Sequence, residues 1–187
     1  MKTPGINTAR LLLDGLREGD AQAFFGYRSL AEVVRFQSFE PVVVGDAVEF
    51  IQRCSAVEFG VADTWAQWAV RLKESGELVG DVGVHFLEEG ARQVEIGFTV
   101  APDHQGQGLG SEAVLGVLGY LFEDLEKHRI VATVDPRNLA SMALLKRVGM
   151  RQEAHFVESL RFKGEWVDDV VWGILKSDWL RQKRLHS

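Results

Sequence analysis

The sequence has 187 residues, of which 46% are hydrophobic and 26% are charged, and these values are typical of a single globular domain. No apolar run reaches the roughly 18–20 residues that a membrane-spanning helix needs, the N-terminus lacks the features of a secretory signal, and the net charge of −6 argues against a nucleic-acid-binding surface. The only cysteine, Cys54, excludes an internal disulfide. We therefore expect a cytoplasmic protein.

The first 60 residues predict one strand and two helices. Residues 9–16, ARLLLDGL, favour a strand, and Asp20 can cap a helix that runs over residues 21–33. A second helix is expected to begin at Asp46, because Glu49 follows it at the spacing of a capping box.

The middle of the chain predicts three consecutive strands. Residues 65–72 and 78–87 are joined by KESGE, a hairpin loop that contains glycine. After the turn EEGAR (88–92), the period-two alternation of apolar residues recurs over 94–100. An antiparallel meander is the expected arrangement.

The second half of the chain predicts two helices and three strands. An amphipathic helix with an apolar stripe from Val114 to Leu125 is followed by a strand over 128–135 and a short helix over 138–148. Residues 151–162 and 166–175 predict a final hairpin, and we expect 181–187 to be a short basic tail in solvent. This order predicts a mixed α/β domain with helices packed on a central sheet.

The sequence HQGQGLGS, residues 104–111, lies between a predicted strand and a predicted helix. Its glycines, Gly106, Gly108 and Gly110, allow main-chain N–H groups to approach a ligand, and Ser111 is able to cap the helix. A helix N-terminus adds partial positive charge. The segment therefore predicts a phosphate or pyrophosphate site.

Two common nucleotide loops do not fit this segment. A Walker loop requires Lys followed by Ser or Thr after the glycines, and Ser-Glu stands here instead. The dinucleotide fingerprint requires a glycine where this sequence has Ser111, and its loop follows the first strand of a parallel unit rather than the last strand of a meander.

Two segments together resemble the GNAT superfamily of acyl-CoA N-acyltransferases. Residues 105–110, QGQGLG, match the signature Q/R-x-x-G-x-G/A, and NLASMALLKRVGM (138–150) resembles the second signature, N-x-x-S-x-x-L-L-x-x-x-G-F. TARLLLDGL, GELVG and FKGEWVDDVVWGIL resemble the branch that acetylates the N-termini of ribosomal proteins. The resemblance covers residues 8–180, which we expect to form one N-acetyltransferase domain.

The resemblance implies a mixed, mostly antiparallel sheet of about seven strands, with helices on both faces, that splays between the fourth and fifth strands. It implies acetyl-CoA as co-substrate and no metal. Main-chain groups near Phe98, Thr99 and Val100 would pair with the pantetheine arm. Other residues expected to bind acetyl-CoA are Gln105, Gly106, Gln107, Gly108, Leu109, Gly110, Ser111, Asn138 and Ser141.

Three residues are candidates for catalysis. Glu95 matches the position of a catalytic glutamate in several acetyltransferases of the superfamily, although a carboxylate that faces solvent or pairs with a neighbouring strand would fit the pattern equally. Glu158 matches a glutamate of the ribosomal-protein branch. Ser141 is expected to hydrogen-bond the departing sulfur, because Leu145 stands where many relatives carry a tyrosine. A neighbouring histidine, His85, could relay a proton or be structural.

The expected activity is direct transfer of an acetyl group to a primary amine, with a protein or peptide N-terminus as the acceptor. Acetylation of a small amine (a polyamine, an amino acid or an antibiotic) and a non-catalytic acyl-CoA sensor are the alternatives. The amine acceptor is the expected partner, with no nucleic acid and no membrane, and a homodimer is left open. The five tryptophans are expected to pack on sheet faces and interfaces.

Overall fold

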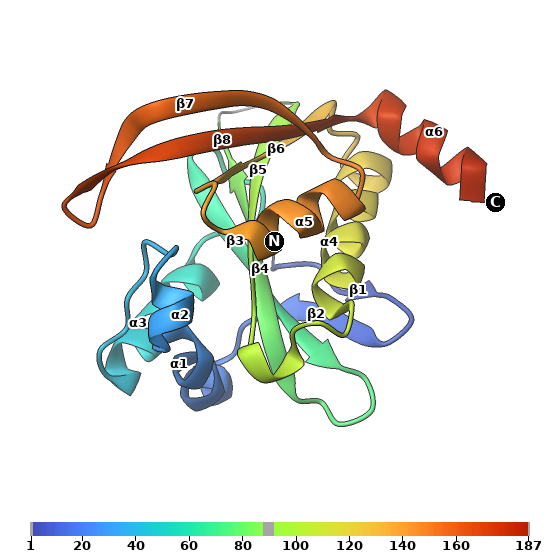
Figure 1. Ribbon diagram of the computed structural model, residues 1–187. Helices are drawn as coiled ribbons and strands as arrows, with labels where there is room; N and C mark the ends of the chain where they lie inside the picture. The colour runs from blue at the N-terminus through green and yellow to red at the C-terminus, as the bar shows by residue number, and fades with distance from the viewer. Residues whose placement is uncertain (1, 88–91, 187) are drawn as a thin grey trace.

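The computed structural model describes residues 2–87 and 92–186, and within these ranges eight strands form one sheet that carries six α-helices (Figure 1). The strands are β1 (Ile6–Asn7), β2 (Leu11–Gly15), β3 (Thr64–Leu72), β4 (Leu78–Phe86), β5 (Gln93–Val100), β6 (Arg129–Val134), β7 (Arg151–Phe162) and β8 (Glu165–Leu175). The helices are α1 (Ala21–Arg28), α2 (Ala31–Val34), α3 (Val44–Ala56), α4 (Leu109–Gly119), α5 (Leu139–Arg147) and α6 (Lys176–His186). Short turns of helix are η1 (Glu18–Asp20), η2 (Pro102–His104) and the π-helical η3 (Tyr120–Asp124).

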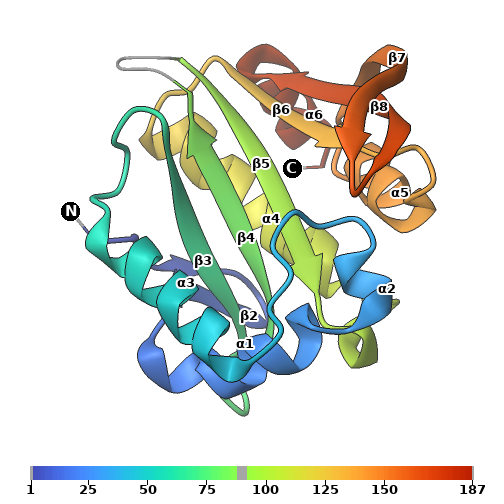
Figure 2. The same cartoon turned by 90° about the vertical axis from the view of Figure 1, so that its left-hand side faces the viewer.

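The strands lie in the order β1-β2-β3-β4-β5-β6-β8-β7, and every neighbouring pair is antiparallel except β5 and β6. These two strands are parallel and pair only where Gln93–Glu95 faces Arg129–Val131. Beyond Glu95 they diverge (Figure 2). The predicted mixed sheet and its splay are confirmed, and the strand that raises the expected count is the two-residue β1.

Helices cover both faces of the sheet, as predicted. On one face, α4 and η3 bury an apolar stripe that includes Val114, Leu118 and Phe122 against the strands. On the opposite face, α1 and α3 pack through Phe24 and Ile51. Because the sheet is enclosed on both sides, its central strands are buried along almost their whole length.

The helix predicted over residues 21–33 is interrupted. Its first part, α1, ends at Arg28, and Leu30 has an extended backbone (φ −66°, ψ 132°) before α2 begins. The interruption places the buried side chains of Tyr27 and Arg28 at the end of α1, where both hydrogen-bond Asp81. This long-range polar contact is absent from the local helical pattern.

The start predicted for the second helix is wrong, because α3 begins at Val44 rather than at Asp46. Asp46 stabilises the N-terminus from inside the first turn, where its carboxylate accepts hydrogen bonds from the main-chain N–H groups of Val42 and Val43, at 2.7 and 3.0 Å. These two bonds lower the pKa of Asp46. Glu49 is exposed and takes no part in this cap.

The C-terminal segment is a helix. Residues 181–186, expected to be a tail, continue α6, and Trp179 packs on Phe122 with ring centroids 6.0 Å apart. Trp179 Nε1 also donates to Glu123 Oε1 at 2.8 Å. The turn expected at 88–92 lies, except for its last residue, outside the described residues. Within residues 2–87 and 92–186, no helix is long and apolar enough to cross a bilayer.

Candidate active site

The splay leaves one edge of β5 without a strand partner beyond Glu95. Phe98, Thr99 and Val100, expected to pair with pantetheine, lie on this part of the strand. The hydroxyl of Thr99 is buried and has no hydrogen-bond partner among the described residues. The edge of β5 therefore offers main-chain groups to an extended ligand, as the free edge of a sheet does.

The glycine loop has the backbone of an anion site. Gly106 and Gly108 adopt left-handed conformations, with φ of 73° and 78°, and Gly108 is the N-cap of α4. The main-chain N–H groups at the start of α4 have no acceptor within their own helix. They are therefore available to an anion at the end of β5.

Close packing explains the third glycine of the loop. A Cβ on Gly110 would lie 2.8 Å from Leu144 Cδ1 and 2.9 Å from Val100 Cγ2, so no side chain fits between α4, α5 and β5. Ser111 follows inside the first turn, and its expected role as the helix cap is wrong, because Gly108 holds that position. Instead, Ser111 Oγ accepts a hydrogen bond from Arg147 Nη1 at 3.2 Å.

Arg10, which directly precedes β2, holds the glycine loop in place. The sequence did not predict this contact. Its Nη1 donates to the carbonyl of Gln107 at 3.0 Å, and its Nε donates to Glu112 at 2.7 Å. Burial raises the pKa of Glu112, but the hydrogen bonds from Thr8 and Arg10 together outweigh this effect. The pKa of Glu112 is therefore lowered overall. Gln105 donates to the carbonyl of Val100 at 3.0 Å and so ties the loop to β5.

Helix α5 packs near the glycine loop, and its N-terminal end lies at the gap between β5 and β6. Asn138 is its N-cap, as predicted, and Asn138 Oδ1 accepts a hydrogen bond from the main-chain N–H of Ser141 at 3.1 Å. Asn138 and Ser141 face the splay, and Leu145 is fully buried in the core. The structure therefore places the hydroxyl of Ser141, and no tyrosine, at this end of the helix.

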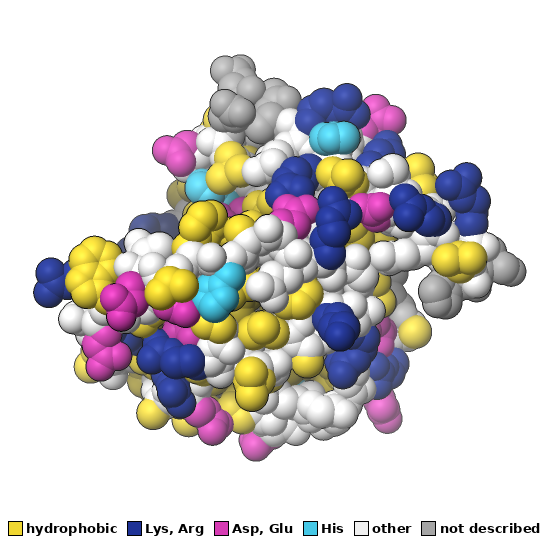
Figure 3. Space-filling model, turned by 45° about the horizontal axis from the view of Figure 1, so that its top comes forward, with side chains coloured by type: hydrophobic (Ala, Val, Ile, Leu, Met, Phe, Trp, Pro, Cys, Tyr) yellow, Lys and Arg dark blue, Asp and Glu magenta, His cyan; other side chains and the backbone are white. Residues whose placement is uncertain are grey.

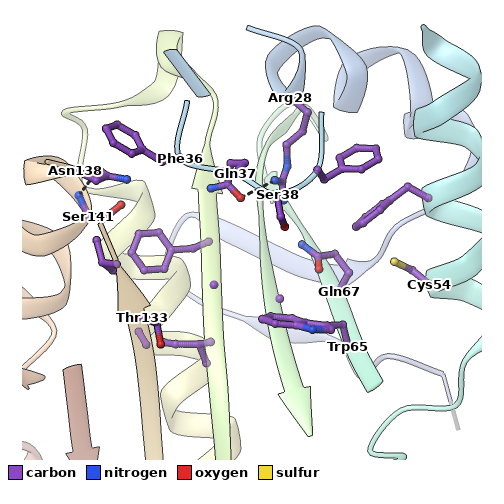
Figure 4. A pocket seen from close by; sticks show the side chains of 18 of the residues that line it. Arg28, Phe36, Gln37, Ser38, Cys54, Trp65, Gln67, Thr133, Asn138 and Ser141 are labelled. Carbon is purple, nitrogen blue, oxygen red and sulfur yellow. Dashed lines mark hydrogen bonds between the residues drawn. The ribbon is translucent and has the colours of Figure 1, made fainter. Parts of the chain in front are cut away.

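A cavity of about 540 Å³ opens between the splay and the helices of the other face (Figure 4). On the splay side its lining includes Phe98, Asn138 and Ser141. On the other side α1, α3, β3, β4 and the segment between α2 and α3 line it with Arg28, Phe36, Gln37, Ser38, Phe39, Phe50, Arg53, Cys54, Val57, Thr64, Trp65, Gln67 and Gly83. One cavity therefore joins the splay to a second, aromatic half.

A buried ionic cluster lies beneath the second half. Asp81 is fully buried and accepts hydrogen bonds from Tyr27 Oη, Arg28 and Gln67 Nε2. Burial and the charge of Asp81 raise the pKa of Tyr27 well above its usual range. Burial lowers the pKa of Arg28, but the charges of Asp81 and Tyr27 and the hydrogen bonds to them together outweigh it, so the pKa of Arg28 is raised overall.

The candidate base Glu95 lies beside this cavity but is not part of its lining. Its Oε2 is 3.9 Å from His85 Nδ1, and the His85 ring stacks on Trp65 with centroids 5.0 Å apart. Burial and the negative charge of Glu95 raise the pKa of Asp169 on β8. Glu95 thus shares its side of the sheet with a histidine and a second carboxyl group.

The structure does not bring Glu158 to the cavity. Glu158 is an exposed residue of β7 with a left-handed backbone (φ 45°), and its N–H donates to Asp168 Oδ1 at 2.9 Å. The surrounding hairpin exposes hydrophobic side chains, including Val157 and Trp166. Figure 3 shows hydrophobic side chains at the surface of the face that it views. At its tip, Lys163 Nζ donates to the carbonyl of Val34 at 2.7 Å, next to the segment that covers the cavity.

Two residues expected to lie away from the site line the cavity. Cys54 is distant in sequence from both signature motifs, yet it forms part of the wall. Burial raises the pKa of its thiol from 9.0 to about 11, so it is protonated at neutral pH and unreactive. Trp65 also lines the cavity, whereas Trp68, Trp172 and Trp179 are buried as expected.

Comparisons with known proteins agree with this geometry. The family model described as Acetyltransferase (GNAT) domain matches residues 10–151. The Uncharacterized N-acetyltransferase YnaD of Bacillus subtilis (strain 168) is 30% identical over 174 residues, which cover 93% of this chain and 98% of that protein. The ribosomal protein uS5-alanine N-acetyltransferase of Escherichia coli (strain K12) is 28% identical over 132 residues, covering 70% of this chain and 63% of that protein.

A solved structure shows the same fold. The crystal structure of an acetyltransferase of the GNAT family from Bacillus anthracis superposes with a TM-score of 0.83 at 28% sequence identity, over 93% of this chain and 99% of that chain. With the splayed sheet, the glycine loop and the family match in agreement, this chain belongs to the GNAT family and is an acetyl-CoA-dependent N-acetyltransferase.

Proposed function

We propose that this enzyme transfers an acetyl group directly to the α-amine of a peptide or protein N-terminus. The observation that carries the proposal is the single cavity, which joins the splay between β5 and β6 to a separate half lined by α1, α3 and β3. Two substrates could enter from different sides and meet beside Gly97, Asn138 and Ser141. Proximity of this kind contributes much of the rate of a two-substrate reaction.

The donor half fits the shape of acetyl-CoA. The free edge of β5 at 98–100 would pair with the pantetheine arm, and the amides of 105–111 would hold the pyrophosphate, with Asn138 beside the arm. When bound, acetyl-CoA supplies an acetyl thioester as the electrophile. The left-handed glycines provide the close main-chain approach that a pyrophosphate requires.

Glu95 would accept the proton that the amine must lose before it attacks. An alkyl ammonium is almost fully charged at neutral pH, so a base is needed. Glu95 stands two residues from the cavity-lining Gly97 on the same face of β5, which corresponds to roughly 7 Å along a strand. That separation suits transfer through one water molecule. Glu158 is the second candidate, because it is exposed on β7 and none of its sequence neighbours lines the cavity, whereas Ile96 and Gly97 beside Glu95 do.

Ser141 would donate a hydrogen bond to the departing sulfur. Its hydroxyl faces the cavity, and its main-chain N–H is already used by Asn138, which fixes the position of the residue. The protonated thiol of Cys54 in the opposite wall of the cavity supports direct transfer over an acyl-enzyme, because the thiolate is the nucleophilic form.

The peptide acceptor is supported by the similarity to the E. coli enzyme that is named for the alanine of uS5, and this similarity also supports action in the cytoplasm. Acetylation of a polyamine, amino acid or antibiotic is the alternative within enzymes, and acyl-CoA sensing without turnover is the alternative outside them.

The test is release of free CoA thiol from acetyl-CoA in the presence of a panel of amines. Turnover with N-terminal peptides, and little with polyamines, amino acids or antibiotics, is the expected result. A preference for one of the small amines would contradict the peptide assignment. Thermal stabilisation by acetyl-CoA with no turnover on any amine would identify a sensor.

A further inference from the structure

Two glutamines are held by one buried ion pair in the acceptor half of the cavity, which is the half lined by α1, α3 and β3 where the amine is proposed to bind. Gln67 on β3 and Gln37, between α2 and α3, both line the cavity. Gln67 donates to Asp81, and Gln37 accepts from Arg28, while Arg28 and Asp81 pair with each other. The buried cluster thus fixes two amide groups that reach the cavity from different elements (Figure 4).

The ion pair decides which way each amide points. A carboxylate bonded to Arg28 only accepts hydrogen bonds, so Gln67 must turn its NH₂ group toward Asp81. Its carbonyl Oε1 is then left for the cavity, above Gly83, where a Cβ would lie only 2.8 Å from that oxygen. Gln67 therefore presents a hydrogen-bond acceptor.

Gln37 points the opposite way for the same reason. The guanidinium of Arg28 only donates, and its Nη1 lies 3.0 Å from Gln37 Oε1. The nitrogen of Gln37 is turned away from Arg28, toward the side on which Asn138 and Ser141 lie (Figure 4). Gln37 therefore presents a hydrogen-bond donor.

One fixed acceptor and one fixed donor are complementary to a peptide group, which carries one N–H and one C=O. A polyamine carries only donors and several positive charges. The charges of the lining do not favour it, because Asp135 is paired with Arg137 and the other charged residues of the lining, Arg28 and Arg53, are cationic. Phe36, Phe39 and Trp65 supply apolar wall around the two amides.

We infer that Gln67 and Gln37 bind the first peptide group of the acceptor, so that the enzyme selects an α-amine that is followed by an amide. The inference rests on the proposed function and adds the two residues that determine its specificity. Arg28 and Asp81 act through these glutamines as positioning residues.

The test compares Gln67→Met and Gln37→Met, which keep the side-chain length and remove the amide. Gln52→Met is the matched control, because Gln52 is exposed on α3 and does not line the cavity. KM and kcat are measured with an alanyl dipeptide and with n-butylamine, which has the amine but no amide. Binding of the dipeptide in the presence of CoA is measured by calorimetry.

Each cavity variant should raise KM and the dissociation constant for the dipeptide by about tenfold, the value of one hydrogen bond in a site that is otherwise intact. The parameters for n-butylamine and all those of Gln52→Met should not change. Equal losses with both amines, or unchanged dipeptide binding in both variants, would overturn the inference.

Unfolding of a variant and failure of the proposed function can each be distinguished from failure of this inference. Gln37 lies outside the buried cluster's core, so Gln37→Met gives an answer even if Gln67→Met unfolds, and thermal melts identify that case. Absence of turnover on every amine would contradict the proposed function, yet the calorimetric comparison would still test the two glutamines. Turnover on spermidine with no binding of the dipeptide would overturn the inference and leave acetyl transfer standing.

Discussion

Arg28 on α1 donates hydrogen bonds to both carboxylate oxygens of Asp81 on β4, from Nε to Oδ1 at 3.0 Å and from Nη2 to Oδ2 at 2.5 Å. Asp81 is completely buried, and the Arg28 side chain is 7% exposed. This pair joins the first helix to the centre of the sheet and lies beside the part of the cavity that α1, α3 and β3 line. It therefore links the stability of the fold to the shape of the site.

Arg28→Met should lower the free energy of unfolding by about 3–5 kcal/mol, because it leaves the buried charge of Asp81 without its partner. Denaturant titration measures the change. Arg17→Met is the control, since Arg17 is a surface residue paired with Asp14 and should cost less than about 1 kcal/mol. Equal costs for the two variants would show that the buried pair does not stabilise the fold.

Gly108→Val should abolish CoA binding. Gly108 has a φ of 78°, which a β-branched residue adopts only at a cost of about 1–3 kcal/mol, so the loop would rearrange. Calorimetric titration with CoA measures the effect. Gly60→Val places the same strain (φ 87°) in a loop far along the chain and should leave CoA affinity intact. Unchanged affinity in Gly108→Val would refute the pyrophosphate site.

Glu95→Gln should reduce kcat by about 10²–10⁴-fold, the usual contribution of a general base, with CoA affinity unchanged. Glu158→Gln is the comparison and should have a small effect. Normal turnover by Glu95→Gln would assign Glu95 a structural role.

Ser141→Ala should lower kcat by about tenfold or more, the value of a hydrogen bond to a charged group. The cap of α5 should survive, because the donor to Asn138 is the main-chain N–H of Ser141 and not its hydroxyl. The rate is measured by thiol release, and an unchanged thermal melt confirms the intact helix. A wild-type rate would leave water as the proton source for the sulfur.

Cys54 should make the fold less stable at high pH. Burial raises the pKa of its thiol from 9.0 to about 11, so the native state keeps a proton that the unfolded state loses above pH 9. Stability is therefore retained below pH 9 and falls between pH 9 and 11. Denaturant titrations of wild type and Cys54→Ala should diverge in that window, and parallel curves would mean that the thiol is not buried in solution.

The sequence was sufficient for the elements whose signals are local. Period-two alternation identified β4 and β5, the apolar stripe identified α4, and the three spaced glycines identified the loop that precedes it. Asn138 was recognisable as a cap because Asn favours that position and a helical pattern follows it. The two signature motifs then indicated the splay, which no local pattern encodes.

Only the tertiary structure decided how the part of the cavity lined by α1, α3 and β3 is built. Arg28, Gln37, Cys54 and Gln67 come from separate elements, and nothing in their local sequence shows that they line one cavity. Tyr27 and Arg28 at the end of α1 likewise bind Asp81, which lies more than 50 residues away along the chain. The tendency to form a helix or a strand is carried by neighbouring residues. A buried ion pair and the amides that it orients depend instead on which elements pack together.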